Sequence, residues 1–330
     1  MKENTFVSII IPLVGINDYF LESYPHLLNL DYKHYEIIVL PDNSVSQDFP
    51  GIKIIPTGKV SPAVKRDIGA ENAKGELLFF LDDDSYPQTD WIDKALPYFN
   101  DLSVGAVGGP AITPPNDSFL QKISGAVFLT KVGGGIPERY YPIGKVKEID
   151  DWPSVNLIVR KDLFIKIGGF KSEYWPGEDT KLCLEIIKEG GNILYTPDVI
   201  VWHHRRSGLL RHLKQVGNYG LHRGFFAKKY PETSFKLLYF IPSFFMLYLC
   251  IFIVALLLNN SMALYLMPVF VLYLCALIYA FFDINKKIKD FKVSLSSLYY
   301  IFLTHIWYGI RFIYGFVFVR ELKSKLRQAD

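Results

Sequence analysis

The chain has 330 residues, with 36 Lys plus Arg against 33 Asp plus Glu and a formal net charge of +3 at pH 7. Half of the residues are hydrophobic and 21% are charged, which excludes a disordered chain, and the balanced charge provides no overall basic field to attract nucleic acid. Cys183, Cys250 and Cys275 share no metal-ligand spacing, so a disulfide framework and a cysteine zinc site are both unexpected and a reducing compartment is the default.

Up to about Tyr230, apolar runs rich in β-branched residues alternate with helical patterns, which predicts an α/β fold with a largely parallel sheet. The predicted strands are 7–11, 36–40, 52–55, 77–81 and 199–202, and the predicted helices are 62–75, 161–167 and 180–188. Asp42 comes two residues after the predicted strand 36–40, and the run 82–84 directly follows the predicted strand 77–81. Ligands of open α/β sheets bind beyond the carboxyl ends of strands, so these acidic residues are site candidates.

Three consecutive acids, Asp82, Asp83 and Asp84, follow the apolar strand LLFFL. Adjacent carboxylates repel one another unless a cation neutralises them, and their oxygens suit Mg²⁺ or Mn²⁺. The chain has no P-loop and no G-x-G-x-x-G motif, so a metal, rather than a backbone cradle, is expected to carry the charge of a diphosphate ligand. A solvated loop with a helix cap is the alternative.

Two long uncharged apolar runs, 237–258 and 262–282, are each long enough to cross a membrane as a helix, and a short Asn-Asn-Ser turn joins them. They predict a membrane hairpin. The residues 1–5 do not begin a signal peptide, so the part before the hairpin is expected to stay in the cytosol.

A third apolar stretch, 295–319, contains His305 and Arg311 and many aromatic residues. Charge at mid-membrane is costly, so this stretch either lies at the interface, re-enters the membrane or forms a third span. Basic residues prefer the cytoplasmic side, which favours a segment that does not span. The basic residues on either side of the stretch are Lys286, Lys287, Lys289 and Lys292 before it and Arg320, Lys323, Lys325 and Arg327 after it.

Several ordered blocks carry a resemblance to a known family. They are V-S-I-I-I-P, E-I-I-V-L-P-D-N-S, K-R-D-I-G-A, F-L-D-D-D-S-Y-P, N-L-I-V-R-K-D-L-F, G-E-D-T-K-L-C-L-E-I and V-W-H-H-R-R. Over residues 5–225 the chain resembles the inverting family 2 glycosyltransferases, which have the GT-A fold. The resemblance implies a nucleotide-sugar donor (a UDP-sugar is favoured), a divalent metal (Mn²⁺ or Mg²⁺) and a single displacement at the anomeric carbon.

The membrane region extends the resemblance to bacterial exopolysaccharide and cell-surface glycan transferases, such as the succinoglycan glucosyltransferase type. The expected organisation is a cytosolic catalytic domain over 1–230 and a membrane region over 231–330, in a multi-pass protein of the inner or plasma membrane. Between 205 and 229, basic residues alternate with leucines and aromatics, which suits an anionic lipid surface. This pattern favours a glycan acceptor linked to a polyprenyl diphosphate over a soluble acceptor.

The resemblance assigns donor contacts near the sheet edge. Asp42 matches the residue that contacts the nucleobase, and an Asx-turn is its structural alternative. Lys65 and Arg66 match a basic position that faces the nucleotide, and solvated surface cations are the alternative. The full set expected to bind the donor is Pro12, Asp42, Lys65, Arg66, Asp82 and Asp83.

The metal ligands follow from the same matches. Asp84 would bind the metal directly, and Asp82 would bind the metal or the ribose. Asp83 is an alternative ligand because three consecutive acids leave the register of the motif open. His203 matches the late histidine of the family, with His204 as the competing choice.

Asp179 matches the family's catalytic base, which takes the proton of the attacking acceptor hydroxyl. It opens a predicted helix, whose N-terminal dipole favours the ionised carboxylate. Glu178 is a candidate for helix capping or acceptor binding. Gly133–Gly135 predicts a mobile acceptor loop, and the segment 215–220 lacks the Gln-x-x-Arg-Trp motif of processive synthases, which favours non-processive transfer.

Three other functions are compatible with parts of the pattern. A polyprenyl-phosphate sugar synthase would use the same donor chemistry with a lipid phosphate as acceptor. An acid-cluster phosphohydrolase would need a second acidic pair and a supporting lysine, for which the sequence offers no convincing set. A non-catalytic nucleotide-sugar-binding scaffold at the membrane would not need the acidic, Glu-Asp and histidine blocks that are present.

Overall fold

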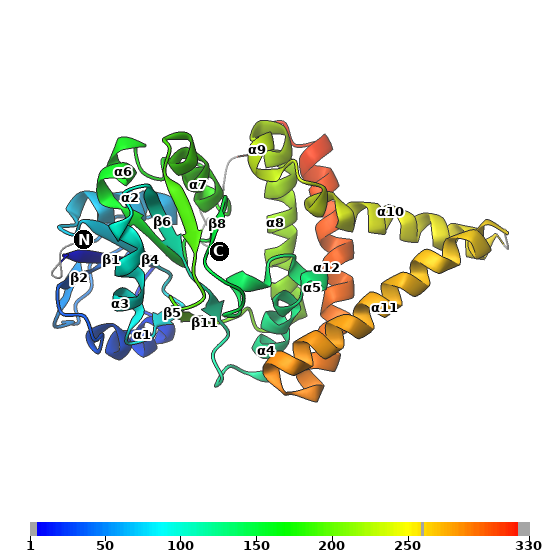
Figure 1. Cartoon of the computed structure of the whole chain (residues 1–330), viewed down its shortest axis with the longest axis horizontal. Helices are drawn as coiled ribbons and strands as arrows, with labels where there is room; N and C mark the ends of the chain where they lie inside the picture. The colour runs from blue at the N-terminus through cyan, green and yellow to red at the C-terminus, as the bar shows by residue number, and fades with distance from the viewer. Residues whose placement is uncertain (1–4, 259–260, 323–330) are drawn as a thin grey trace. The chain divides into compact units, whose positions relative to one another are not determined.

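The computed structural model describes residues 5–258 and 261–322 (Figure 1). Within this part, residues 5–114 and 141–204 form one compact unit, and residues 115–140 and 205–322 form a second. The start of the chain at 1–4, most of the expected Asn-Asn-Ser turn, and the expected tail cations Lys323, Lys325 and Arg327 lie outside the described residues. The domain boundary expected at residue 230 stays a prediction.

The first unit is built on an eight-stranded sheet with the order β3-β2-β1-β4-β9-β6-β10-β8. Strands β3, β2, β1 and β4 run parallel, β10 is parallel to β6, and β9 is antiparallel to both of its neighbours. This arrangement confirms the predicted α/β class with a mostly parallel sheet. The strands are β1 (Val7–Pro12), β2 (Tyr35–Leu40), β3 (Ile52–Ile54), β4 (Leu77–Leu81), β6 (Val104–Gly108), β8 (Lys147–Ile149), β9 (Asn156–Arg160) and β10 (Asn192–Tyr195).

Helices cover both faces of this sheet, because its central strands are apolar on both sides. Ile9 of β1 packs in the cluster that contains Phe20 and Trp91, whereas Ile10 faces α2, where a Cβ on Gly69 would lie 2.6 Å from Ile10 Cγ2. Helices α1 and α3 accordingly lie on one side and α2, α6 and α7 on the other (Figure 1). The helices of this unit are α1 (Asp18–Leu28), α2 (Pro62–Asn72), α3 (Trp91–Ala95), η1 (Leu96–Asn100), α6 (Lys161–Lys166) and α7 (Glu178–Lys188).

A small sheet extends the edge where β4 ends. Its order is β5-β11-β7, formed by Ser85–Pro87, Val201–His203 and Ala111–Ile112. The close approach of its strands requires glycine at position 109, where a Cβ would lie 1.7 Å from the carbonyl oxygen of Val199. This small sheet brings β11 beside the turn that follows β4.

The second unit is helical, and its centre is the parallel pair α8 and α12. Glycines let the two backbones approach closely: a Cβ on Gly224 would lie 2.1 Å from the carbonyl oxygen of Phe312, and one on Gly217 would lie 2.3 Å from Trp307 Nε1. The glycines of the segment 215–220 therefore belong to a helix-packing surface. The helices of this unit are α4 (Phe119–Ala126), η2 (Val127–Leu129), α5 (Lys131–Gly134), η3 (Pro137–Arg139), α8 (Leu209–Lys229), α9 (Pro231–Ser234), α10 (Leu237–Leu257), α11 (Met262–Ile288) and α12 (Phe291–Val317).

A buried histidine joins three helices of this unit. His212 of α8 is fully buried, its Nδ1 lies 2.8 Å from Ser124 Oγ of α4, and its Nε2 lies 2.9 Å from Thr304 Oγ1 of α12. Burial lowers the pKa of His212 to about 4, so the ring is neutral at pH 7. Nearby, Gly133 is tightly packed, with its Cβ position 2.0 Å from the carbonyl oxygen of Val127. The expectation of a mobile loop at Gly133–Gly135 is therefore wrong for Gly133, which is a packed helical residue.

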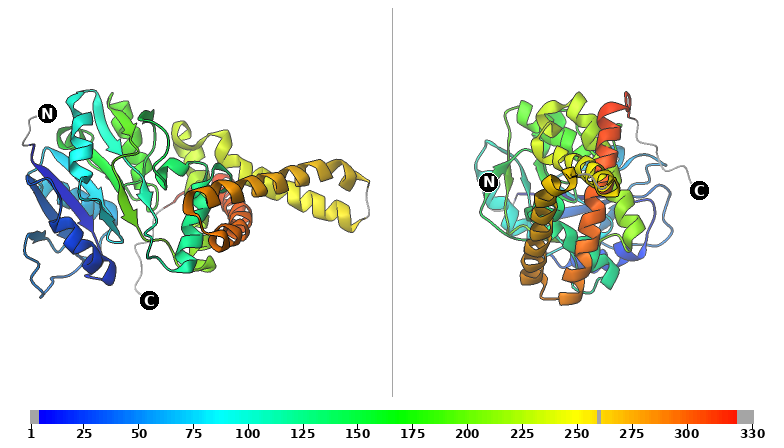
Figure 2. Two further views of the ribbon diagram at one scale, coloured as in Figure 1. Left: turned by 60° about the horizontal axis from the view of Figure 1, so that its bottom comes forward. Right: turned by 90° about the vertical axis from the view of Figure 1, so that its right-hand side faces the viewer.

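Helices α10 and α11 form a hairpin that leads away from α12 (Figures 1 and 2). The hydroxyl of Tyr248 donates to the carbonyl oxygen of Leu266 at 3.0 Å, and the rings of Phe252 and Phe270 lie 5.5 Å apart. Within the described part of the chain, these two helices are long and apolar enough to cross a membrane, and only 22% and 6% of their most apolar windows are buried. Helix α12 runs across the base of the hairpin and does not meet the same criterion.

Candidate metal and donor site

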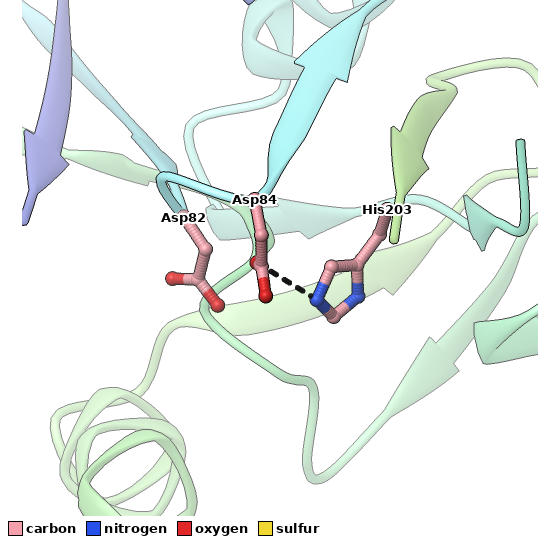
Figure 3. Close-up of side chains that lie close together, drawn as sticks. All are labelled: Asp82, Asp84 and His203. Carbon is pink, nitrogen blue, oxygen red and sulfur yellow. Dashed lines mark ion pairs between the residues drawn. The ribbon is translucent and has the colours of Figure 1, made fainter. Parts of the chain in front are cut away.

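Asp82, Asp84 and His203 lie together at the carboxyl end of β4 (Figure 3). The turn that carries the two aspartates is closed by Ser85, whose N–H and hydroxyl both donate to the carbonyl oxygen of Asp82, at 3.2 and 2.7 Å. β11 pairs with β5 so that His203 lies opposite Ser85. As a result His203 Nε2 lies 3.1 Å from Asp84 Oδ1.

This cluster fits a divalent metal by its donor set. One potential ligand atom from each of the three residues lies within 4.8 Å of the others. The side chains of Asp84 and His203 are 9% and 13% exposed, while that of Asp82 is 31% exposed, so the cluster is open on the Asp82 side. Two carboxylates and an imidazole would leave coordination positions on a divalent cation that phosphate oxygens or water could fill.

The two competing ligand candidates are held elsewhere. Asp83 Oδ2 accepts a hydrogen bond of 2.6 Å from Asn17 Nδ2, and Asn17 also caps α1 by accepting from the N–H of Phe20. The ring of His204 pairs with Glu22, at 3.1 Å between Nε2 and Oε2. Neither Asp83 nor His204 belongs to the cluster that could hold a metal. The role of Asn17 was not predicted, because a polar residue before a helix usually signals only a cap.

Arg66 connects the acidic turn to the start of α7. Its side chain is 3% exposed, with Nη2 2.6 Å from Asp82 Oδ1 and Nη1 3.3 Å from Glu178 Oε1. A planar guanidinium can bind two carboxylates at once, which an ammonium cannot do with the same geometry. Arg66, expected to face the nucleotide, thus fixes Asp82 and Glu178 relative to each other.

Glu178 is the most perturbed acid of this region. Its side chain is 7% exposed, and its second oxygen, Oε2, is buried without a hydrogen-bond partner among the described residues. Burial, followed by the neighbouring charge of Asp179, raises the pKa of Glu178 to about 8 even though Arg66 opposes the shift. A protonated Glu178 can donate a hydrogen bond, so the group is not limited to accepting.

Asp179 lies in the first turn of α7 and is only partly buried. One of its carboxylate oxygens, Oδ1, accepts from the N–H of Thr180 at 2.8 Å. Thr180 is fixed in turn, because its hydroxyl donates to Asp151 Oδ1 at 3.1 Å and Asp151 is 6% exposed. The helix N-terminus therefore presents a positioned carboxylate that can accept a proton.

Lys65 is bonded within the protein. Its ammonium donates to the carbonyl oxygens of Leu13 at 2.6 Å and Leu40 at 3.2 Å, and it also pairs with the carboxylate of Asp42. These three bonds match the three N–H donors of a lysine. Lys65 thus ties the ends of β1 and β2 together next to Pro12, the last residue of β1. Donor binding by Pro12 and Asp42 stays a prediction.

Asn156 has a supporting role that was not predicted. It is fully buried, and its amide donates to the carbonyl oxygens of Val199 at 2.8 Å and Pro110 at 3.2 Å, while its own oxygen accepts from Trp91 Nε1 at 3.0 Å. These bonds hold the segment leading into β11, which carries His203. The available signal was a polar residue at the start of an otherwise apolar strand, within the block N-L-I-V-R.

Comparison with known proteins identifies the family. Residues 8–163 match the family model described as Glycosyl transferase family 2. These residues belong to that family, and the chain therefore carries a family 2 glycosyltransferase domain. The resemblance drawn from the sequence blocks is confirmed at this level.

Similar proteins include several named glycosyltransferases. The chain is 23% identical over 324 residues to the dolichyl N-acetyl-alpha-D-glucosaminyl phosphate 3-beta-D-2,3-diacetamido-2,3-dideoxy-beta-D-glucuronosyltransferase of Methanococcus voltae, covering 92% of this chain and 95% of that protein. It is 25% identical to Glycosyltransferase AglE of Haloferax volcanii, covering 64% and 72%. It spans only 43% of the pre-mycofactocin glycosyltransferase of Mycobacterium tuberculosis, at 25% identity.

Among solved structures, the chain resembles a mannosyltransferase from Pyrobaculum calidifontis determined in complex with GDP-Man and Mn²⁺. The TM-score is 0.49 and the sequence identity 18%, with 67% of this chain and 62% of that chain covered.

Proposed function

We propose that the protein is a membrane-anchored, metal-dependent, inverting glycosyltransferase of the GT-A fold. It transfers a sugar from a nucleoside-diphosphate donor to a hydroxyl of a polyprenyl-linked glycan, in the synthesis of a cell-surface polysaccharide. The observation that carries this proposal is the linked arrangement of the Asp82–Asp84–His203 cluster and the Asp179 helix end through Arg66. The reaction must stabilise negative charge on the leaving diphosphate and remove a proton from the attacking hydroxyl. The carboxylates of the metal cluster and of the helix end lie in different environments, which suits these two separate tasks.

The residues of the chain have separate tasks in this reaction. Asp82, Asp84 and His203 would hold a divalent cation, which when bound supplies a Lewis acid for the departing diphosphate. Asp179 accepts the proton of the acceptor hydroxyl as that oxygen attacks the anomeric carbon. A single base and a single displacement invert the anomeric centre, so NMR of the product is expected to give the configuration opposite to that of the donor. Retention of the donor configuration would contradict this mechanism.

The membrane assignment is supported by the exposed apolar surface of α10 and α11. A core helix of a soluble protein is mostly buried, whereas these helices leave most of their apolar windows exposed. The same observation supports an interfacial position for α12, which crosses the base of the hairpin and carries Arg311 (Figure 1). An interfacial α12 would leave the basic segments before and after it on the cytoplasmic side, and the catalytic domain is expected on that side too.

A lipid-linked acceptor is supported by the names of two similar proteins. The Methanococcus voltae protein is named for a dolichyl-phosphate-linked sugar, and a glucosyl-dolichyl phosphate glucuronosyltransferase of Haloferax volcanii is 22% identical over 218 residues. Both names describe transfer to a sugar that a lipid phosphate carries, which differs from a polyprenyl-phosphate sugar synthase, where the lipid phosphate itself is the acceptor.

The test is a donor and acceptor matrix with the full chain in nanodiscs. UDP-, GDP- and dTDP-sugars are each supplied with Mn²⁺ and with one of three acceptors: a free glycan, the same glycan on a polyprenyl diphosphate, or polyprenyl phosphate. We expect nucleotide release to be fastest with a UDP-sugar and the lipid-linked glycan. Equal rates with the free and the lipid-linked glycan would mean that the hairpin only anchors the protein and that the acceptor need not be lipid-linked. A preference for polyprenyl phosphate would identify a lipid-phosphate sugar synthase. Absence of turnover with every donor would favour a non-catalytic scaffold.

A further inference from the structure

A hollow of about 370 Å³ lies where the ends of α8 and α12 meet, within the second unit. Phe225, Lys228 and Lys229 line it from α8, and Arg320 and Glu321 line it from the segment after α12. Phe225 is 4% exposed and forms an apolar wall, whereas Lys228, Lys229 and Arg320 are exposed at their positions around it. The hollow thus combines three cations and one carboxylate with an aromatic surface.

The geometry keeps these cations around the hollow. Lys228 Nζ donates to the carbonyl oxygen of Val319 at 2.7 Å, which ties the last turn of α8 to the end of α12 and leaves two of its three N–H donors for other acceptors. The ammonium groups of Lys228 and Lys229 also lie 6.0 and 5.7 Å from the centre of the Phe225 ring. Both lysines therefore lie beside the aromatic wall of the hollow, and Lys229 also lies 5.8 Å from the centre of the Tyr230 ring.

The hollow lies at the base of the apolar hairpin. The ring of Phe316, near the end of α12, lies 5.5 Å from Phe240 in α10 and 6.3 Å from Phe235 just before α10. The neighbouring apolar side chains are exposed: Leu237 is 72% and Phe318 is 66% exposed. Cations beside exposed apolar residues, at the level where a spanning helix begins, are expected at the headgroup layer of a membrane.

We propose that this hollow binds the phosphodiester headgroup of an anionic phospholipid of the bilayer in which the hairpin is inserted. Lys228, Lys229 and Arg320 hold the phosphate oxygens, and Phe225 contacts the glycerol and the upper acyl carbons. Such a lipid fixes α12 at the interface at the point where the chain enters the membrane. The proposal rests on the membrane anchoring of the proposed function, but it requires neither the sugar transfer nor the acceptor.

The test measures lipid binding and does not depend on turnover. The full chain, purified in a neutral detergent, is titrated with short-chain phosphatidylglycerol, short-chain phosphatidylcholine, glycerol 1-phosphate and polyprenyl phosphate, and native mass spectrometry records the bound fraction. We expect saturable binding of phosphatidylglycerol and little binding of phosphatidylcholine. Because each cation near an anionic lipid surface contributes about fivefold, replacing Lys228, Lys229 and Arg320 by Ala is expected to weaken phosphatidylglycerol binding roughly 100-fold.

Two further variants keep the result interpretable. Arg320→Ala alone removes a cation without breaking the Lys228–Val319 bond, so it keeps the helix contact and is expected to weaken binding about fivefold. A control with the same loss of charge replaces Lys59, Lys94 and Lys145, all exposed in the first unit, and should bind phosphatidylglycerol like the unaltered chain. If the control variant loses phosphatidylglycerol binding to the same extent, the loss comes from net charge alone and the proposal is overturned. Glycerol 1-phosphate binding as tightly as the lipid, or polyprenyl phosphate displacing it at lower concentration, would overturn the phospholipid assignment.

Discussion

Arg66 provides the most informative perturbation, because one guanidinium holds two acids that lie 96 positions apart in the sequence. Replacing it by Met removes the charge at similar length and leaves Asp82 and Glu178 without their partner. Breaking a buried ion pair costs about 3–5 kcal/mol, and we expect the lower end, about 3 kcal/mol, because Asp82 is 31% exposed and water compensates part of the loss. At about 2–4 °C per kcal/mol, the melting temperature should fall by roughly 6–12 °C.

The effect on turnover should exceed the effect on stability. Arg66 positions the acidic turn and the first turn of α7, and displacement of reacting groups by about 1 Å costs roughly 100-fold in rate. Arg66→Lys restores the charge but not the two-sided contact, so we expect it to recover most of the thermal stability and little of the turnover. Nucleotide release with Mn²⁺ and the preferred donor measures kcat, and differential scanning fluorimetry measures the melting temperature.

Arg160→Met is the matched control. This arginine is partly buried, less so than Arg66, and it donates to the backbone carbonyl oxygens of Val104, Phe99 and Asp101, away from the acidic cluster. It should lower the melting temperature while kcat per folded molecule stays within about threefold. If Arg66→Met and Arg160→Met lose turnover to the same extent, or if Arg66→Lys recovers kcat fully, then the bridging role assigned to Arg66 is wrong.

Three further predictions address the same site. Excess EDTA or the Asp84→Ala substitution should abolish turnover, together with the Mn²⁺ binding that electron paramagnetic resonance measures. Asp83→Ala should retain Mn²⁺ binding, because Asp83 is bonded to Asn17. Full activity in EDTA would refute the metal assignment. Asp179→Asn should lower kcat by about 10²–10⁴-fold with little change in donor affinity, and an unchanged kcat would exclude it as the base. Folding raises the pKa of Glu178 from its ordinary value of 4.5 to about 8. The contribution of Glu178 to the free energy of unfolding is therefore complete below about pH 4.5 and is lost as the pH rises through 8. The total loss is at most about 5 kcal/mol. Glu178→Gln should therefore gain melting temperature relative to the unaltered chain between pH 5.5 and 8.5, and parallel pH profiles of the two would contradict the shifted pKa.

Local patterns were sufficient to predict the position of the acidic cluster. The run LLFFL is typical of a strand buried on both faces, as β4 is, and the residues after such a strand emerge at the edge of the sheet. The three acids at that point therefore had to share an edge with the ends of β1 and β2. Because each step depended on adjacent residues and on a general rule of parallel sheets, the sequence sufficed for this part of the site.

The pairings between distant segments could not be predicted in the same way. No local pattern shows that the ammonium of Lys65 would bond to Asp42 and two carbonyl oxygens. Nor does any local pattern show that the neighbouring Arg66 would contact Glu178. Adjacent basic residues at the start of a helix usually form a solvated face, and their burial is decided by how α2 packs against the sheet. The packing of α4 against α8 and α12 through His212 depended on long-range contacts in the same way.

The electrostatic balance around Arg66 gives an independent reason to expect a bound cation. Asp82 and Glu178 share the guanidinium of Arg66, Asp84 lies in the same cluster as Asp82, and Asp179 follows Glu178 in the chain, so four carboxyl groups are concentrated in this region. The raised pKa of Glu178 is the expected response, because protonating the most buried acid is the least costly way to reduce the excess negative charge. A nucleoside diphosphate would add further negative charge to the same region. If the donor is a nucleoside diphosphate, as proposed, a cation at Asp82, Asp84 and His203 would offset this charge, so donor binding and metal binding should be strongly coupled.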